Sequence, residues 1–153
     1  MDLIVANQTL GGAELEAEVR RRIDRGRDRF YIVVPMIEPQ YESSLWAASD
    51  EGFTPPPTEE EIASAIEQAR MRSEHRLGQM VAMIESAGGR AEGEVGPTDP
   101  FQAVREVLQG RTFDEVIVST LPPGISRWLK LDLPSRVARI TEAPVVTVEA
   151  RRR

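Results

Sequence analysis

Short apolar runs alternate along this chain with longer stretches in which apolar residues recur every three or four positions. The runs at 3–6, 30–34, 116–118 and 144–148 are rich in Val and Ile, and such continuous runs are typical of strands buried on both faces of a parallel sheet. Residues 90–95 alternate only weakly, which predicts an outer, edge-like strand. The pattern therefore predicts a sheet of five strands.

The first helical stretch lies between the first two strands. Leu15, Val19 and Ile23 recur every four residues, which predicts one apolar helix face. Arginines are dense over 20–29, but aspartate and glutamate residues interleave with them. We therefore expect a solvated helix face there rather than a phosphate or nucleic-acid patch.

Two further helices carry clear end signals. Thr58 and Glu61 form a capping box at the start of the first, and the glycines at 88–89 are typical of its end. His75 falls opposite the apolar stripe of this helix, so we expect it to be exposed. Asp99, with a proline after it, predicts the N-cap of the next helix.

The segment 36–57 shows no clear period and contains the proline run 55–57 together with Tyr41, Trp46 and Phe53. Connections of this length are usually lids, partner-binding loops or disordered segments. Two interpretations stay open: a flexible surface loop whose aromatic residues pack locally, or a lid over a ligand cleft.

The alternation of strands and helices predicts an α/β fold, a three-layer αβα sandwich with a parallel sheet in the middle. We expect one domain over 1–150 and a solvated tail at 151–153. Ligands of such sheets bind beyond the carboxyl ends of the strands. That edge would carry residues 7–9, 35–36 and 119–124.

Composition narrows the function. The 153 residues include no Cys and a single His, which excludes disulfides, a cysteine nucleophile and a multi-histidine metal site within one chain. The net charge of −6 argues against a nucleic-acid partner. No apolar run approaches the roughly 20 residues of a membrane span, and no basic leader precedes the first strand. We therefore expect a soluble cytoplasmic protein with no membrane partner and no metal site of its own.

The stretch 114–136 is the part of the chain that points most directly to a ligand. Its apolar strand is expected to end at residue 118 and to enter a loop of Ser, Thr, Pro and Gly at 119–124. A second turn is expected at 134–135, before an arginine-bearing helical stretch. A strand that enters such a loop before a helix is where α/β proteins hold anions, because backbone N–H groups and the helix dipole can face one phosphate.

Four segments resemble the universal stress protein family: LIVANQTLGG at 3–12, GEVGPTDPFQAVREVL at 93–108, DEVIVSTLPPG at 114–124 and APVVTV at 143–148. The resemblance extends over nearly the whole length. It implies a five-stranded parallel sheet in the order 3-2-1-4-5, of the adenine nucleotide alpha hydrolase-like class. It also implies homodimers, commonly through the C-terminal strand. Some members of the family bind ATP and others do not; Mg²⁺ is expected only where ATP is bound.

The chain departs from the pattern of the ATP-binding members. Asn7 stands where those members have an Asp after the first strand, and an amide brings no charge. After the fourth strand the family has Gly, two residues, Gly, nine residues, and then Gly-Ser or Gly-Thr. This chain has prolines at 122, 123 and 134, which remove backbone donors because proline has no N–H.

Two registers relate this chain to the glycine pattern, and both stay open. Counted forward from Ser119, the last glycine position falls on Asp132 and the hydroxyl position on Leu133. Counted back from Ser135, the last glycine position falls on Pro134, the chain keeps one glycine and the final hydroxyl of the motif, and its loop is about two residues longer.

Hydroxyl and cationic side chains offer hydrogen bonds and charge in place of the missing amides. We expect the adenosine near the Asn7 turn and the end of the second strand, and the phosphates over the loop that follows the fourth. The alternative, which stays open, is that 119–128 is a rigid structural loop in which Trp128 and Leu129 cover apolar surface. The candidate nucleotide-binding residues are Asn7, Thr9, Val34, Pro35, Ser119, Thr120, Gly124, Ser126, Arg127 and Ser135.

Three function classes follow. The first is a stress-response protein that binds ATP or another adenine nucleotide. The second is a dimeric regulatory or interaction module of the same fold that binds no nucleotide, which Asn7 and the proline-bearing loop favour. The third is an enzyme. The SGGxDS-type loop of ATP-pyrophosphatases is absent and no paired acid–base constellation can be placed, so we assign no catalytic residue.

Overall fold

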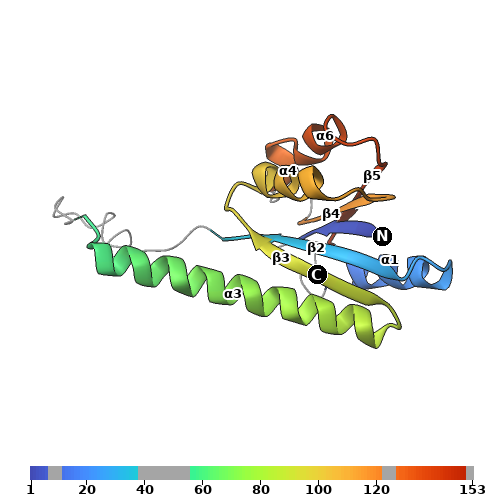
Figure 1. Cartoon of the computed structure of the whole chain (residues 1–153), viewed down its shortest axis with the longest axis horizontal. Coiled ribbons are helices and arrows are strands. Elements are labelled where there is room, and N and C mark those ends of the chain that lie inside the picture. The colour runs from blue at the N-terminus through green and yellow to red at the C-terminus, as the bar shows by residue number, and fades with distance from the viewer. Residues whose placement is uncertain (7–11, 38–55, 122–126, 151–153) are drawn as a thin grey trace.

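The computed structural model describes residues 1–6, 12–37, 56–121 and 127–150, with the backbone alone at residues 127 and 130. Its strands form one parallel five-stranded sheet in the order β3-β2-β1-β4-β5 (Figure 1), which is the order that the resemblance implies. The strands are β1 (Asp2–Val5), β2 (Arg29–Pro35), β3 (Arg90–Gly96), β4 (Val116–Thr120) and β5 (Val145–Glu149). The helices are α1 (Ala13–Asp24), α3 (Glu59–Ser86), α4 (Pro100–Gly110), α5 (Arg127–Lys130) and α6 (Leu133–Ala138).

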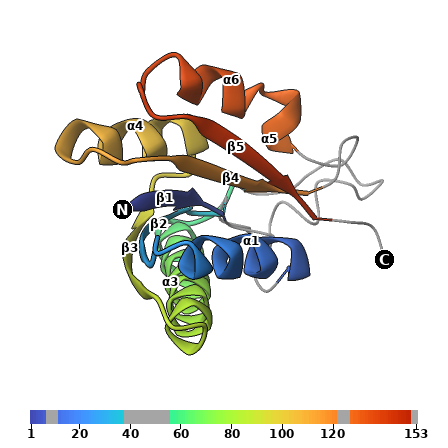
Figure 2. The same cartoon turned by 90° about the vertical axis from the view of Figure 1, so that its right-hand side faces the viewer.

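The sheet is the middle of three layers. Figure 2 shows α1 and α3 on one face and α4, α5 and α6 on the other. Successive side chains of a strand point to opposite faces, and Ile4 accordingly packs in the core on the α1–α3 side, whereas Leu3 and Val5 pack on the α4–α6 side. All three are fully buried, because β1 is the central strand. The predicted three-layer sandwich is confirmed.

The predicted N-caps of α3 and α4 are confirmed. Thr58 caps α3, since its Oγ1 accepts a hydrogen bond from the Glu61 N–H at 3.1 Å, and Asp99 caps α4 in the same way. The first turns of α3 extend past the tips of β2 and β3 (Figure 1), which leaves Ile66 38% exposed although it lies on the predicted apolar stripe. His75 is exposed, as predicted.

Two predicted turns differ from the structure. Ser119 and Thr120 do not begin a loop; they are the last residues of β4 and pair in register with β5, which extends the ladder by two residues. Pro134 and Ser135 do not form a turn; they lie inside the first turn of α6, where a proline needs no intrahelical partner for its missing N–H. Most of the segment 36–57 and the tail 151–153 lie outside the described residues.

The arginine-rich segment holds one buried side chain that the sequence prediction placed in solvent. Arg22 is only 5% exposed. It donates to Asp2 Oδ2 at 3.0 Å, to Glu115 Oε2 at 2.5 Å and to Glu18 Oε1 at 3.0 Å. Arg27 donates to Glu115 Oε1 at 2.8 Å. This cluster joins the end of α1 to the first residue of β1 and to the residue that precedes β4, so it fixes the two strands that frame the candidate site.

Candidate functional site

The switch point of the sheet lies between β1 and β4. From β1 the chain moves outward through β2 to β3, and it then returns to the other side of β1 to form β4 and β5. Val5 of β1 is in register with Val118 of β4, so the carboxyl ends of the two strands lie together. In open α/β sheets ligands bind in the crevice beyond these ends.

Two hydroxyl residues, Ser119 and Thr120, form the tip of β4 at this point, and each is 2% exposed. They point to opposite faces of the sheet. Val118 belongs to the core on the α4–α6 side, so Thr120, two residues on, lies on that side and Ser119 on the α1–α3 side. Ser119 interacts with another group of the chain. Thr120 Oγ1 is buried and has no hydrogen-bond partner within the described part of the chain.

The backbone at these tips is already paired. The Thr120 carbonyl accepts a hydrogen bond from the Ala150 N–H at 2.9 Å, and the Ala6 N–H donates to the Val33 carbonyl at 3.3 Å. At the end of β2, Met36 N–H donates to the Gly96 carbonyl at 3.1 Å. Strand pairing therefore continues close to the edge of the sheet, and among the described residues Thr120 Oγ1 is the buried side-chain atom at the β4 tip that has no hydrogen-bond partner.

The other candidate residues are scattered. Val34 and Pro35 end β2 and are buried, with Val34 in the core on the α1–α3 side. Ser135 is exposed in the first turn of α6, and Arg127 is the first residue of α5. The remaining candidates lie outside the described residues. These are Asn7, Thr9, Gly124 and Ser126.

The backbone at Asp132 bears on the two registers of the glycine pattern. Asp132 precedes α6 with φ 56° and ψ 39°, a left-handed conformation that glycine adopts at far lower cost than other residues. The register counted from Ser119 places a glycine position there, whereas the other register places it on Pro134, whose ring fixes φ at a negative value. The backbone thus favours the first register, in which the hydroxyl position is Leu133, a side chain only 1% exposed.

Two side chains near this region take part in packing. The guanidinium of Arg136 lies 4.2 Å from the ring centroid of Phe101 on α4, so this cation stacks on an aromatic ring. Trp128 of α5 is 8% exposed and belongs to the core on the α4–α6 side. This burial agrees with the alternative from the sequence in which Trp128 covers apolar surface.

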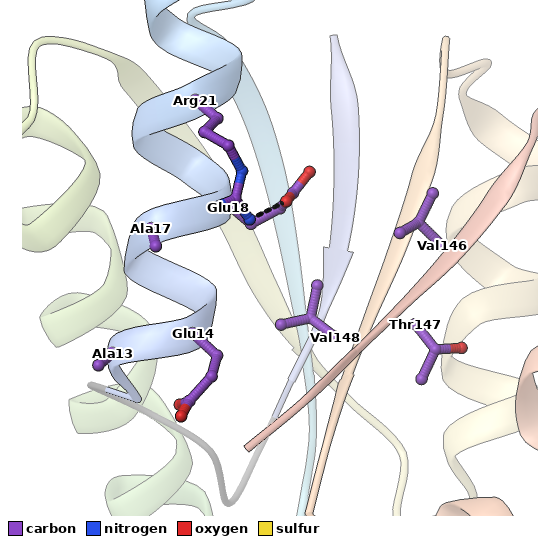
Figure 3. Close-up of a pocket in the computed structure, with 8 residues that line it drawn as sticks. All are labelled: Ala13, Glu14, Ala17, Glu18, Arg21, Val146, Thr147 and Val148. Carbon is purple, nitrogen blue, oxygen red and sulfur yellow. Dashed lines mark hydrogen bonds and ion pairs between the residues drawn. The ribbon is translucent and has the colours of Figure 1, made fainter. Parts of the chain in front are cut away.

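A hollow of about 460 Å³ lies between α1 and β5 (Figure 3), and Val148, one of its lining residues, pairs in register with Ser119 at the tip of β4. Val146 and Val148 line its β5 side, and Glu14, Glu18 and Arg21 line its α1 side. Arg21 is paired with Glu18 at 2.5 Å. Because two carboxylates face a single paired cation, the charge here does not suit a phosphate group.

Neither a metal-binding cluster nor a membrane-spanning helix is present in the described ranges. These ranges contain no cluster of three or more His, Asp or Glu side chains that could hold a metal ion. None of the helices within them combines the length and the apolar character needed to cross a membrane.

No protein-family model matches the sequence, and no curated protein is significantly similar to it. Solved structures do match it. A universal stress protein from Archaeoglobus fulgidus aligns with a TM-score of 0.56 and 12% identity, over 96% of this chain and 91% of that one. A universal stress protein family protein from Arabidopsis thaliana, solved with AMP bound, aligns with a TM-score of 0.59 and 12% identity, over 99% of this chain and 92% of that one. The chain therefore has the fold of the universal stress proteins.

Proposed function

We propose that this chain is a divergent universal stress protein that binds an adenine nucleotide at the carboxyl ends of β1 and β4. The observation that carries the proposal is the pair of buried hydroxyl residues, Ser119 and Thr120, which end β4 at the switch point of the sheet. Apolar side chains fill the rest of that strand. A protein of the same fold has been solved with AMP bound, which supports an adenine nucleotide as the ligand.

The residues at this edge fit an oxygen-rich ligand better than a highly charged one. Thr120 Oγ1 can donate to, or accept from, a ligand oxygen. The described residues offer no carboxylate cluster for Mg²⁺, so Mg²⁺ would enter only with ATP, held through the phosphates. Arg127 at the start of α5 remains the cation proposed to meet a phosphate.

AMP, ADP or ATP is expected to raise the melting temperature of the protein in a concentration-dependent way. At a free ligand concentration 100 times Kd, binding stabilises a fold by about 2.7 kcal/mol, or roughly 5–10 °C for a chain of this size. Differential scanning fluorimetry with each nucleotide measures this shift. Cytidine monophosphate is the control for adenine recognition. Arg127→Ala is expected to reduce the shift, whereas Ser135→Ala should reduce it only in the register counted back from Ser135. No shift with any adenine nucleotide at millimolar concentration would leave the second function below as the better proposal.

The second candidate function is a homodimeric regulatory or interaction module, and the difference between the two edge strands favours it. β3 carries the exposed charged residues Arg90, Glu92 and Glu94, which are typical of an edge protected against pairing. β5 carries no charge from Val145 to Val148, and these side chains are only half-buried. We propose that β5 pairs with β5 of a second copy.

Thr147→Lys is therefore expected to convert a dimer into a monomer, because it places an uncompensated charge on the unprotected edge strand. Light scattering at tens of micromolar measures the mass of both proteins. Thr98→Lys makes the same chemical change at an exposed position outside β5 and should leave the dimer intact. A wild-type protein that is monomeric at that concentration would rule out this pairing.

A further inference from the structure

The hydroxyl of Thr120 is the buried polar group at the switch point that the fold leaves unpaired. The residue is 2% exposed, and its Oγ1 meets no hydrogen-bond partner within the described ranges. A buried hydroxyl without a partner loses the hydrogen bonds that water gave it in the unfolded chain, so it destabilises the free protein. A valine at this position would have nearly the same shape without that loss.

The side of the sheet on which the hydroxyl lies explains why it has no hydrogen-bond partner among the residues that the structure describes. The core on the α4–α6 side near the end of β4 is apolar and includes Val118, Trp128 and Leu133. Ser119 faces the opposite side and interacts elsewhere. Arg136, a cation of the covering helix α6, is stacked on Phe101.

A buried water molecule at Thr120 would find no second unsatisfied buried side chain beside it within the described ranges. Such waters typically make about three hydrogen bonds to otherwise unsatisfied buried groups. Among the described residues, the other unsatisfied buried side-chain atom is Asp2 Oδ1. Asp2 is the first residue of β1, so it lies at the amino end of the parallel sheet, whereas Thr120 lies at the carboxyl end. A water at Thr120 would therefore lack a second side-chain partner.

We infer that Thr120 is a specificity-determining residue of the nucleotide site. Its hydroxyl stays unpaired in the free protein and forms a hydrogen bond to a sugar or phosphate oxygen of the ligand, on the α4–α6 side of the β4 tip. The inference rests on the proposed nucleotide binding. It adds the atom that contacts the ligand, Thr120 Oγ1, and the side of the sheet on which the contact is made.

The experiment compares Thr120→Val with Thr120→Ser and with Thr98→Val. Thr98 is the control, because it is exposed and lies outside both β4 and β5. Thermal unfolding without ligand and calorimetric titration with AMP and with adenosine are measured for all three variants and the wild type.

Without ligand, Thr120→Val is expected to raise the melting temperature by about 2–4 °C, whereas Thr98→Val should leave it unchanged. With ligand, Thr120→Val is expected to weaken binding about tenfold, and Thr120→Ser, which keeps the hydroxyl, should stay close to the wild type. A loss for both AMP and adenosine assigns the oxygen to the sugar, and a loss for AMP alone assigns it to the phosphate.

The outcomes separate this inference from the proposed function. If the wild type binds neither AMP nor adenosine, the proposed nucleotide site is wrong. If the wild type binds and Thr120→Val binds equally well, the site stands and the role of Thr120 is wrong. A lower melting temperature of Thr120→Val without ligand would mean that the hydroxyl has a partner in the free protein, which also overturns the inference.

Discussion

Arg22→Met is expected to lower the free energy of unfolding by about 3–5 kcal/mol, as is typical when one partner of a buried ion pair is removed. Asp2 is 1% exposed, and its Oδ2 accepts from Arg22 at 3.0 Å. Its Oδ1 has no hydrogen bond in the described part of the chain, and Arg27 Nη2 approaches it only to 3.6 Å. Without Arg22 a buried carboxylate would thus lose its main counter-charge. Urea unfolding at neutral pH measures the difference.

Arg20→Met is the matched control for this prediction. Arg20 lies on the same helix and pairs with Glu16 at 3.0 Å, but both side chains are well exposed. An exposed pair of this spacing contributes about 0.3–0.5 kcal/mol, so the control should change stability little. If Arg22→Met also lowered the free energy of unfolding by less than about 1 kcal/mol, the prediction would be wrong. Solvent or a rearranged Arg27 would then stabilise the Asp2 carboxylate.

The same cluster predicts how the Arg22 effect depends on pH. Burial raises the pKa of Glu115, but hydrogen bonds from Arg22 and Arg27 outweigh it and hold this pKa below its ordinary value of 4.5. Burial is also outweighed at Glu18, whose pKa is lowered by Arg21 and Arg22. The stability from a carboxylate with a lowered pKa is present above its unfolded pKa and is lost as the pH falls through the folded one. The difference between wild type and Arg22→Met should therefore shrink in acid, below about pH 4.5.

The strands and most helices could be predicted because their signals are local. Thr58 and Asp99 cap helices whose first residues follow them directly, and β1 and β4 are short apolar runs. The extra two residues of β4 were missed because Ser119 and Thr120 are typical of turns. Their pairing with β5 depends on residues 148 and 149, which no local pattern near β4 contains.

The features that decide the candidate site are not local. Arg22 has its buried partners 20 and 93 residues away along the chain, so its neighbours at 20–29 could only indicate a solvated face. Whether the Thr120 hydroxyl has a partner depends on which helix covers the β4 tip. It also depends on Arg136 of α6, whose guanidinium stacks on Phe101. The left-handed backbone at Asp132 could not be predicted either, since aspartate adopts this conformation more often than most residues but still only in a small minority of its positions.

Gly93→Ala is expected to destabilise the protein by about 3 kcal/mol, because β3 has no room for a side chain at this position. A Cβ atom on Gly93 would lie 2.2 Å from the carbonyl oxygen of Ile32, its partner on β2, and 2.8 Å from Leu77 Cδ1 on α3. The first contact is with backbone, which cannot turn aside as a flexible side chain can. Either the β2–β3 pairing or the packing of α3 on the sheet must shift, and urea unfolding measures the cost.

Gly78→Ala separates this crowding from the general effect of replacing a glycine. Gly78 lies one residue after Leu77 on α3, and a Cβ atom there would meet nothing within 4 Å. Alanine in a helix interior is favoured over glycine by about 0.8–1.0 kcal/mol, so this variant should be more stable than the wild type. Opposite signs for the two variants are the expected result. A Gly93→Ala variant as stable as the wild type would contradict this prediction. It would mean that β3 moves at low cost, and that Leu77 of α3 does not hold the helix closely against Gly93.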